Sequence, residues 1–393
     1  MRDLMSLSER PEIISLAGGF PNTESFPREV FDDVVARMSS DHLASALQYG
    51  PTEGLGELRE EIVKVMAHEG AVARQADLIV TTGGQQGIDL AVRTFVDPGD
   101  VVLAEGPTYP GAVPCFTTYE ADVNHVPVDE HGLRTDVLEA ALARLAAKGR
   151  SAKLLYTIPN FHNPAGVTMS LERRRKVVEL AREHDFMILE DNPYGQIRFE
   201  GEPLPTLWEL DEGAGRAIYI STFSKILAPG LRLGWVAAPA PVLRKMNLGK
   251  QAADLNSSTL TQRFVLEYLR AYDWREHVDR LNAIYRSRRD AMVSALQREM
   301  PVKTEWNTPS GGLFVWAALP DYIDTSDLLA EATTRHQVAF VPGSAAYLDG
   351  QGTNCMRLNF SGSTEETIAE GVRRIGAAVG DMAELYRAFR VDR

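Results

Sequence analysis

Strand and helix patterns alternate along the chain from about residue 41 to residue 285. Short apolar runs that end in glycine or polar residues are followed by longer amphipathic stretches. Such alternation predicts an α/β fold, with a mostly parallel central sheet and helices on both of its faces. We therefore assign residues 41–285 to one large domain.

The pattern changes after a long helical stretch that begins at Trp274 and ends near Glu299. Strand patterns follow at residues 312–317, 338–341 and 356–360, and a closing helix comes after them. Ser363 and Glu366 have the spacing of a capping box at the start of that helix. A chain of 393 residues is long enough for two domains, so we predict a smaller α+β domain over residues 286–393.

Lys225 lies just beyond a buried strand pattern, residues 217–220. A lysine held there loses solvation, so its pKa falls and its amine becomes a nucleophile toward carbonyl groups. Thr222, Ser224 and Arg232 flank it, and hydroxyl groups with a forked guanidinium suit a phosphate. A lysine beside a phosphate site indicates an imine with pyridoxal 5′-phosphate (PLP). Since most single lysines are solvated surface charges, this prediction depends on the groups described next.

Gly83, Gly84 and Gln85 connect a strand pattern at residues 78–81 to a helix pattern at residues 85–96. Glycines there let backbone N–H groups approach an anion, and the helix N-terminus adds a favourable dipole. The turn matches neither the dinucleotide fingerprint nor the P-loop. Glycines between a strand and a helix are common turn residues, so this signal is weak by itself.

Asn163, Asp191 and Tyr194 follow two strand patterns that flank an amphipathic helix, residues 171–184. In such a strand–helix–strand unit these side chains lie beyond the carboxyl ends of two strands, where open α/β sheets bind their ligands. Asn-Pro and Asp-Asn-Pro also form turns in any protein. The prediction of a site therefore depends on the whole set.

Taken together, these runs resemble the fold-type-I, PLP-dependent aminotransferases of class I/II, and within them the branch of the 2-aminoadipate and kynurenine aminotransferases. The resemblance spans nearly the whole chain in the family's order. It implies the family's fold, a PLP cofactor and ping-pong transfer of an amino group between an L-2-amino acid and a 2-oxo acid. It also implies that residues 1–40 pack with the small domain. The matching runs are residues 15–21, 48–54, 83–86, 106–109, 163–166, 190–194, 221–235 and 356–360.

The resemblance implies a role for each residue around the cofactor ring. Lys225 holds the cofactor and moves the substrate α-proton as base and then acid. Asp191 keeps the pyridine nitrogen protonated, so that the ring can accept electrons. Tyr194 and Asn163 bond to the phenolic oxygen, and Tyr109 stacks on the ring face.

The phosphate has its own set of expected ligands: Thr222, Ser224, Arg232, Gln85 and the N–H groups near Gly84. This branch commonly carries a serine at the position of Gly84, so we expect somewhat weaker cofactor binding there. Tyr49 of the neighbouring subunit is implied to reach the same phosphate, which requires a homodimer.

Arg357 resembles the arginine that binds the substrate α-carboxylate, with Asn163 and Gly19 in the same substrate site. Arg2 aligns with an arginine that some relatives use for an acidic side chain, although it lies almost at the terminus, where fraying is usual. Glutamate or 2-aminoadipate would follow from a role for Arg2. Phe20 makes an aromatic or branched aliphatic substrate an equal alternative.

Composition limits the partners. The net charge is −13, with 41 basic and 54 acidic residues, which disfavours nucleic acids and anionic membrane surfaces. The two cysteines lack metal or disulfide spacing, and neither a signal peptide nor a membrane span is evident, so we expect a cytoplasmic protein with no metal. Residues 173–176 should form a solvated basic helix face, and His162 should line its loop without a chemical role.

Three alternatives stay open at this point. Elimination, decarboxylation or oxidation could occur on the same scaffold, because these PLP reactions share the cofactor residues. A non-catalytic ligand sensor, as in the MocR-type regulators that carry a similar aminotransferase-like domain, is the second alternative. Those regulators have an N-terminal DNA-binding winged helix, for which we expect no room before Ala17. A structural or interaction protein is the third, and the intact lysine, aspartate, tyrosine and arginine set disfavours it.

Overall fold

The computed structural model describes residues 10–301 and 303–388 of the chain. An eight-stranded sheet forms its centre, with the strands in the order β2-β9-β8-β7-β6-β3-β4-β5. The five strands β3, β4 and β6 to β8 are parallel, whereas β9 is antiparallel to both of its neighbours. The predicted mostly parallel sheet is therefore confirmed. The strands are β2 (Leu78–Thr81), β3 (Val101–Gly106), β4 (Asp122–Asp129), β5 (Gly132–Leu133), β6 (Ala152–Thr157), β7 (Met187–Asp191), β8 (Ala217–Thr222) and β9 (Gly234–Ala237).

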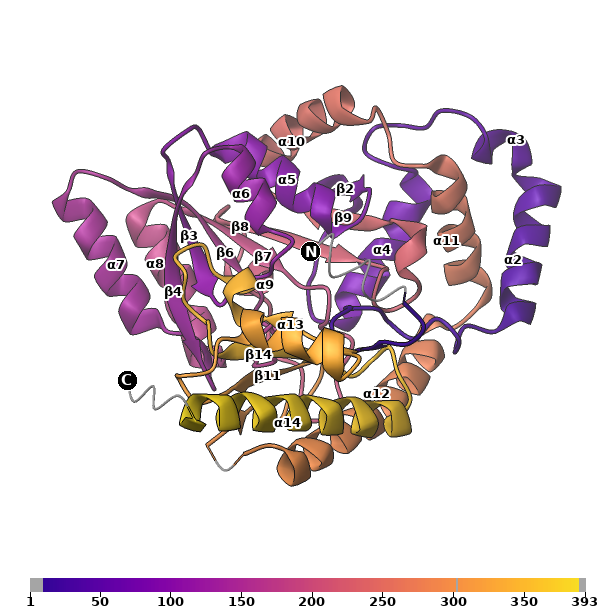
Figure 1. Ribbon diagram of the computed structural model, residues 1–393. Helices are drawn as coiled ribbons and strands as arrows, with labels where there is room; N and C mark the ends of the chain where they lie inside the picture. Colours follow the sequence, from indigo (N-terminus) through magenta and orange to yellow (C-terminus); the bar gives the residue numbers. More distant parts are fainter. Residues whose placement is uncertain (1–9, 302, 389–393) are drawn as a thin grey trace.

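Helices cover both faces of this sheet (Figure 1). They are α4 (Gly56–His68), α5 (Gly84–Phe95), α6 (Val113–Thr118), α7 (Thr135–Ala147), α8 (Leu171–His184), α9 (Leu207–Leu210) and α10 (Ala240–Ala253), with the short 3₁₀ turns η1 (Gln75–Asp77) and η2 (Pro229–Leu231). α11 (Thr259–Ala271) packs beside α4 instead. Alternate residues of a strand point to opposite faces. In β3, Val101 and Leu103 join the core beneath α7 and α8, while Val102 and Ala104 join the core that contains α5. Because both faces are buried, the strands read as continuous apolar runs.

A second, antiparallel sheet has the order β10-β11-β14-β13. The long helices α12 and α14 pack against each other beside it (Figure 1). This sheet carries two residues of the site described below, Phe314 on β11 and Arg357 on β14. The elements of this region are β10 (Glu305–Trp306), β11 (Phe314–Ala318), β13 (Val341–Pro342), β14 (Cys355–Asn359), α12 (Trp274–Glu299), α13 (Thr325–Arg335), η3 (Gly343–Ala346) and α14 (Glu365–Ala388).

The single strand expected at residues 338–341 is divided in the structure. β12 (Val338–Ala339) pairs in parallel with β1 (Ile14–Ser15), whereas β13 pairs with β14 in the other sheet. Phe340, fully buried between them, marks the point at which the extended chain changes partner. Periodicity alone could not separate the two pieces, because both are extended and apolar.

The start of α14 also differs from the sequence-based expectation. The helix begins at Glu365, and the hydroxyl of Thr364 accepts the hydrogen bond from the N–H of Thr367 at 3.3 Å. Thr364 is therefore the capping residue, and the predicted capping by Ser363 is wrong by one position. Both residues carry a hydroxyl, so spacing could not distinguish them.

The basic run at residues 173–176 is only partly a solvated face. Arg174 is fully buried, and its guanidinium donates to the backbone carbonyls of Met169, Pro159 and Pro205 and to Oδ1 of Asn160. The expectation of a solvated face is wrong for this residue, because the loops around the helix supply enough acceptors to bury a charge.

The N-terminal part of the chain contacts both regions. β1 pairs with β12, while α2 (Arg28–Asp41) packs against α11 and is followed by α3 (Leu43–Ala46). The domain limits at residues 40 and 285 stay predictions. Among the described helices, none combines the length and the apolar character that a membrane crossing demands.

Candidate active site

A cavity of about 280 Å³ lies beyond the carboxyl ends of β6, β7 and β8, where open α/β sheets bind ligands. The structure brings almost all of the predicted site residues together around it, although they come from segments far apart in the sequence. The predicted residues in its lining are Gly19, Gly84, Gln85, Tyr109, Asn163, Asp191, Tyr194, Thr222, Ser224, Lys225, Arg232 and Arg357.

Two predicted residues are not in this lining. Tyr49 lies outside the cavity with 80% of its surface exposed. Arg2 lies outside the described residues. The expected role of Tyr49 in a neighbouring subunit stays a prediction.

Lys225 follows β8 and reaches into the cavity from its floor. Its amine donates a hydrogen bond to the backbone carbonyl of Gly19 at 3.0 Å. Burial lowers the pKa of Lys225 to about 8, and the positive charges of Arg357 and Arg232 act in the same direction. An amine that loses its proton in this range can act as a nucleophile and as a base.

Asp191 ends β7, and both it and its partner are buried. The hydroxyl of Tyr156 donates to Oδ2 of Asp191 at 2.7 Å. Burial raises the pKa of Asp191 to about 6, against the hydrogen bond from Tyr156, which lowers it. Sequence reasoning missed Tyr156, and the available signal was a tyrosine that follows two leucines near the end of the strand beside β7.

Thr222, Ser224 and Arg232 form a corner suited to an anion. The hydroxyls of Thr222 and Ser224 lie 2.8 Å apart. Arg232 adopts a left-handed backbone conformation, with φ of 49°, and its guanidinium lies over Gly83. A Cβ atom at Gly83 would come 2.5 Å from Nη2 of Arg232, so a larger residue there would displace the guanidinium, and the φ of +76° at this position also favours glycine.

The N-terminus of α5 faces the same corner. Gly83 precedes this helix without a side-chain cap, so the first N–H groups of the helix are available to a ligand. The side-chain amide of Gln85 is engaged elsewhere, since it donates to the carbonyl of Gly111 at 2.6 Å. Its backbone N–H, in the first turn of the helix, is the group that can serve an anion.

Arg357 and Asn163 form the opposite end of the cavity. Nη1 of Arg357 donates to Oδ1 of Asn163 at 2.9 Å, and Nη2 donates to the carbonyl of Ala17 at 2.8 Å. The guanidinium lies 4.3 Å from the ring centroid of Phe314, a contact that sequence reasoning did not identify. Burial lowers the pKa of Arg357 to about 10, and its buried Nε has no hydrogen-bond partner among the described residues.

His162, expected to line its loop, is buried beside Glu105. Its Nε2 lies 3.0 Å from Oε2 of Glu105, and its Nδ1 accepts from the N–H of Ala165 at 3.1 Å. Glu105 also accepts from the hydroxyl of Thr157 and the N–H of Ile158. These contacts hold the turn that presents Asn163 to the cavity, and a carboxylate in the apolar strand β3 was the available signal.

The residues present fit PLP. The corner at Arg232 and α5 offers donors to a phosphate, with space that a Cβ at Gly83 would fill. At the far end of the cavity, Arg357 keeps an unpaired buried donor for a carboxylate. Lys225 and Asp191, between these ends, are the amine and the carboxylate that an aldehyde and a ring nitrogen require.

Comparison with known proteins decides the family. Residues 11–375 match the family model described as aminotransferase class I and II. The chain belongs to the class I and II aminotransferases. It is 42% identical over 380 residues to aromatic-amino-acid aminotransferase 1 of Thermococcus litoralis, covering 96% of this chain and 91% of the relative. The 2-aminoadipate transaminase of Thermus thermophilus is 37% identical, with 98% and 94% of the two chains covered.

Solved aminotransferase structures have the same fold. The kynurenine aminotransferase of Pyrococcus horikoshii, solved with PMP, superposes with a TM-score of 0.93 at 40% identity, over 97% of this chain and 94% of that one. LysN, the α-aminoadipate aminotransferase of Thermus thermophilus, solved with N-(5′-phosphopyridoxyl)-L-leucine, gives a TM-score of 0.90 at 36% identity, over 98% and 95%. The predicted fold, family and enzyme class are confirmed: this aminotransferase is PLP-dependent and acts on amino acids and 2-oxo acids.

Proposed function

We propose that the cavity around Lys225 is the active site of this aminotransferase. Lys225 would hold the cofactor through its aldehyde, Asp191 would pair with the ring nitrogen, and Tyr109 would contact the ring. Tyr194 and Asn163 hydrogen-bond the phenolic oxygen. The phosphate is bound by Gly84, Gln85, Thr222, Ser224 and Arg232, and the substrate carboxylate by Arg357 with Asn163 and Gly19 beside it. The observation that carries this assignment is the convergence of these residues on one cavity.

The chain's own groups handle the proton in the reaction. When bound, PLP supplies the electron sink that stabilises a carbanion at the substrate α-carbon. Arg357 orients the substrate through its carboxylate. Nζ of Lys225, whose pKa is lowered to about 8, is the group that would accept the substrate α-proton as a base and release it again as an acid. Asp191 also accepts a hydrogen bond from the hydroxyl of Tyr156, and this bond favours the charged form of the carboxylate.

The side-chain end of the substrate is proposed to be aromatic or branched aliphatic. Phe20, Ile88 and Phe314 line the cavity, and the described cations in its lining are Lys225, Arg232 and Arg357, which already have roles. Apolar walls without a further cation favour an apolar substrate. The names of the relatives include both an aromatic-amino-acid enzyme and a 2-aminoadipate enzyme, so the choice needs a measurement.

A half-reaction screen provides that measurement. The PLP form would be mixed with each of the twenty common amino acids and with 2-aminoadipate and kynurenine, and conversion to the pyridoxamine form followed by absorbance. We expect the fastest conversion with aromatic or branched aliphatic donors. A preference for acidic donors that disappears in Arg2→Ala would instead assign the side-chain end to Arg2.

We propose a homodimer in which Tyr49 reaches the phosphate of the neighbouring cofactor. Large apolar side chains are exposed near the Tyr49 loop, on α2, on and just after α3, and on and just before α11, three helices that pack together. They are Phe31, Leu43, Leu47, Leu255 and Leu260. The hydroxyl of Thr259 on α11 donates to the carbonyls of Ala46 and Gln48, which holds the Tyr49 loop against this surface. A patch of this kind suits a second copy of the chain.

The assignment of Lys225 is tested by replacing it. Lys225→Ala should form no borohydride-stable adduct with PLP and should lose about 10²–10⁴-fold in turnover, the usual contribution of a positioned acid–base group. Lys245→Ala, an exposed lysine on α10, serves as the control and should keep both. Adduct formation at another peptide in the Lys225→Ala protein would overturn the assignment.

A further inference from the structure

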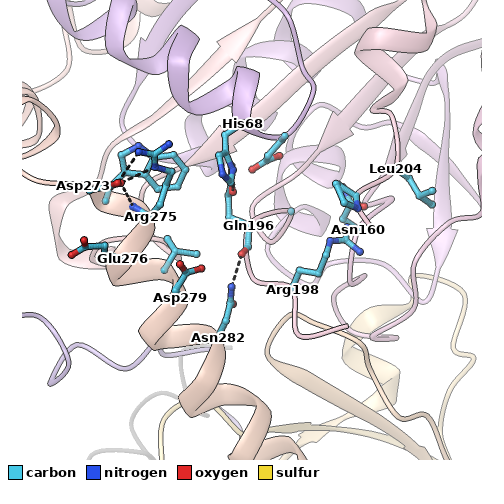
Figure 2. Close-up of a pocket in the computed structure, with 15 residues that line it drawn as sticks. His68, Asn160, Gln196, Arg198, Leu204, Asp273, Arg275, Glu276, Asp279 and Asn282 are labelled. Atoms are coloured by element: carbon cyan, nitrogen blue, oxygen red, sulfur yellow. Dashed lines mark hydrogen bonds and ion pairs between the residues drawn. The ribbon is translucent and has the colours of Figure 1, made fainter. Parts of the chain in front are cut away.

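A second cavity, of about 430 Å³, shares no lining residue with the active site. It lies between the end of α4, the start of α12 and the loop that follows β7 (Figure 2). Its volume is in the range of small-molecule sites. None of the residues in its lining has a role in the proposed transamination.

Arg198, in the wall of this cavity, is a cation with no ion pair at contact distance to any residue that the structure describes, although the carboxylates of Glu69 and Glu202 act on it electrostatically. Among the described residues it makes no hydrogen bond or ion pair, and its buried Nε has no partner. Its guanidinium lies 4.7 Å from the ring centroid of Phe161, and burial lowers the pKa of Arg198. A forked cation held in this way, with donors unused, is suited to a carboxylate.

Acceptors occupy the other side of the cavity. Glu276 and Asp279 project from α12 and form no ion pair within the described part of the chain. Nδ2 of Asn282 donates to the backbone carbonyl of Gln196 at 3.1 Å, which leaves the buried Oδ1 of Asn282 without a partner. Figure 2 shows Arg198 and Asn160 on one side, Glu276 and Asp279 on the other, and Gln196 and Asn282 between them.

The separation of charge indicates the chemistry of a ligand. A simple anion would meet Arg198 but would be repelled by Glu276 and Asp279. A simple cation would be attracted by Glu276 and Asp279 but repelled by Arg198. A molecule with a carboxylate at one end and an ammonium at the other satisfies both sides at once.

We propose that this second cavity is a binding site for a small zwitterion of the amino-acid type, whose carboxylate pairs with Arg198 and whose ammonium pairs with Asp279, Glu276 and Oδ1 of Asn282. This site is separate from the pocket assigned to Arg357. It does not depend on the proposed roles of the active-site residues.

Residues in the wall of this second cavity also form hydrogen bonds with the loop that follows Asp191. Nδ2 of Asn160 donates to Oδ1 of Asn192 at 2.9 Å, and Asn192 directly follows Asp191 in the chain. Nδ2 of Asn192 in turn donates to Glu69, which lines the cavity. A ligand on Arg198 would therefore bind one hydrogen-bonded layer away from the residues that hold the cofactor.

Calorimetric titration of the PLP-loaded protein tests the proposal. The probes are γ-aminobutyrate and ε-aminocaproate, which carry no α-amino group for the active site to act on. Their controls are butyrate and butylamine, which carry one charge each. We expect the zwitterions to bind at least ~10-fold more tightly than either control, since hydrogen bonds to charged groups are lost with each deletion.

Matched variants locate the binding. Arg198→Met keeps the length of the side chain and should weaken zwitterion binding at least ~10-fold. Arg275→Met is the control, because Arg275 lines the same cavity but is already paired with Asp273 at 2.7 Å, and it should change affinity less than ~2-fold. If Arg198→Met does not fold, Asp279→Asn, at an exposed position, replaces it and should weaken binding of the zwitterions without weakening binding of butyrate, which this carboxylate repels.

Three results would each overturn the proposal. One is the absence of saturable heat with both zwitterions. Another is equal affinity in Arg198→Met and Arg275→Met. The third is loss of binding in Arg357→Lys with retention in Arg198→Met, which would place the probes in the active site instead. Failure of the proposed transamination roles would leave all of these titrations interpretable, because no turnover is measured.

Discussion

The hydroxyl of Tyr156 donates to Oδ2 of Asp191 at 2.7 Å, across two neighbouring parallel strands. Tyr156 is fully buried and Asp191 is 5% exposed. This contact opposes the effect of burial, which by itself raises the pKa of Asp191. It also fixes the carboxyl group while leaving Oδ1 for a cationic ring nitrogen, so Tyr156 acts through Asp191 as a positioning residue.

Tyr156→Phe should therefore weaken cofactor binding. The substitution removes one hydrogen bond to a buried carboxylate, worth about 1.5–3 kcal/mol, so the dissociation constant for PLP should rise about 10–100-fold. A spectroscopic titration of cofactor-free protein measures it. Tyr119→Phe is the matched control, because its hydroxyl bonds to Asp89 at 3.3 Å outside the cavity. Equal affinities in the two variants would contradict the role given to Tyr156.

The sequence predicted those parts of the site that follow local rules. Lys225 and Asp191 each come just after an apolar strand, and the parallel arrangement of such strands brings their carboxyl ends together. The ends of α8 and α12 were also predicted correctly, because a helical pattern of apolar residues is a local signal. In each helix the pattern stops where the helix ends.

Other contacts could not be predicted, because they join segments that only the fold brings together. Tyr156 meets Asp191 through strand register, and Phe314 meets Arg357 across the antiparallel strands β11 and β14. Arg174 looked like a surface charge, since nothing in its helix shows that loop carbonyls surround it. The division of residues 338–341 between two sheets could not be predicted either, because it depends on which strands the fold places beside them.

Arg357→Lys should raise KM for amino-acid substrates about 10–100-fold. Arg357 uses Nη1 and Nη2 in two directions and keeps Nε unpaired, whereas a lysine offers one point charge. The affinity for PLP, measured in the same preparation, should stay within about twofold, because the phosphate corner is untouched.

Arg289→Lys supplies the comparison for that experiment. Arg289 is also buried, donates to the carbonyl of Pro309 and lies 5.7 Å from the ring of Phe199, but it does not line the cavity. Its replacement should disturb packing to a similar extent without changing KM. A similar rise of KM in both variants would indicate a general loss of structure rather than a lost carboxylate contact.

The reactivity of Lys225 should depend on pH with a midpoint near its lowered pKa of about 8. The rate of covalent capture of PLP by cofactor-free protein should rise as pH increases through this value and level off above it, since only the neutral amine reacts. Between about 8 and 10.5 the unfolded chain keeps a proton that the folded lysine has lost, so this group's contribution to the free energy of unfolding rises with pH.

A neighbouring substitution tests the cause of that shift. Arg357→Met removes a positive charge that lowers the pKa of Lys225, so the midpoint of the capture rate should move to higher pH. Lys64, which is exposed on α4 and paired with Glu61, provides a reference in the same samples. Its reaction with PLP would be followed by mass spectrometry. A midpoint that does not move in Arg357→Met would rule out a contribution from Arg357 and leave burial and the charge of Arg232 as the causes of the lowered pKa.

Tyr49 permits a test of action between subunits. Tyr49→Phe should weaken PLP binding in the homodimer, and Lys225→Ala should abolish covalent binding. In a mixed dimer of the two variants, the subunit with an intact Lys225 receives Tyr49 from its partner. That site should regain the affinity of the unaltered protein. If Tyr49 acted within its own chain, every Lys225 in the mixture would lack it and no site would recover. The exposure of Tyr49 at 80%, among the apolar side chains of α2, α3 and α11, favours the first outcome, which affinity-tagged heterodimers and a PLP titration would detect.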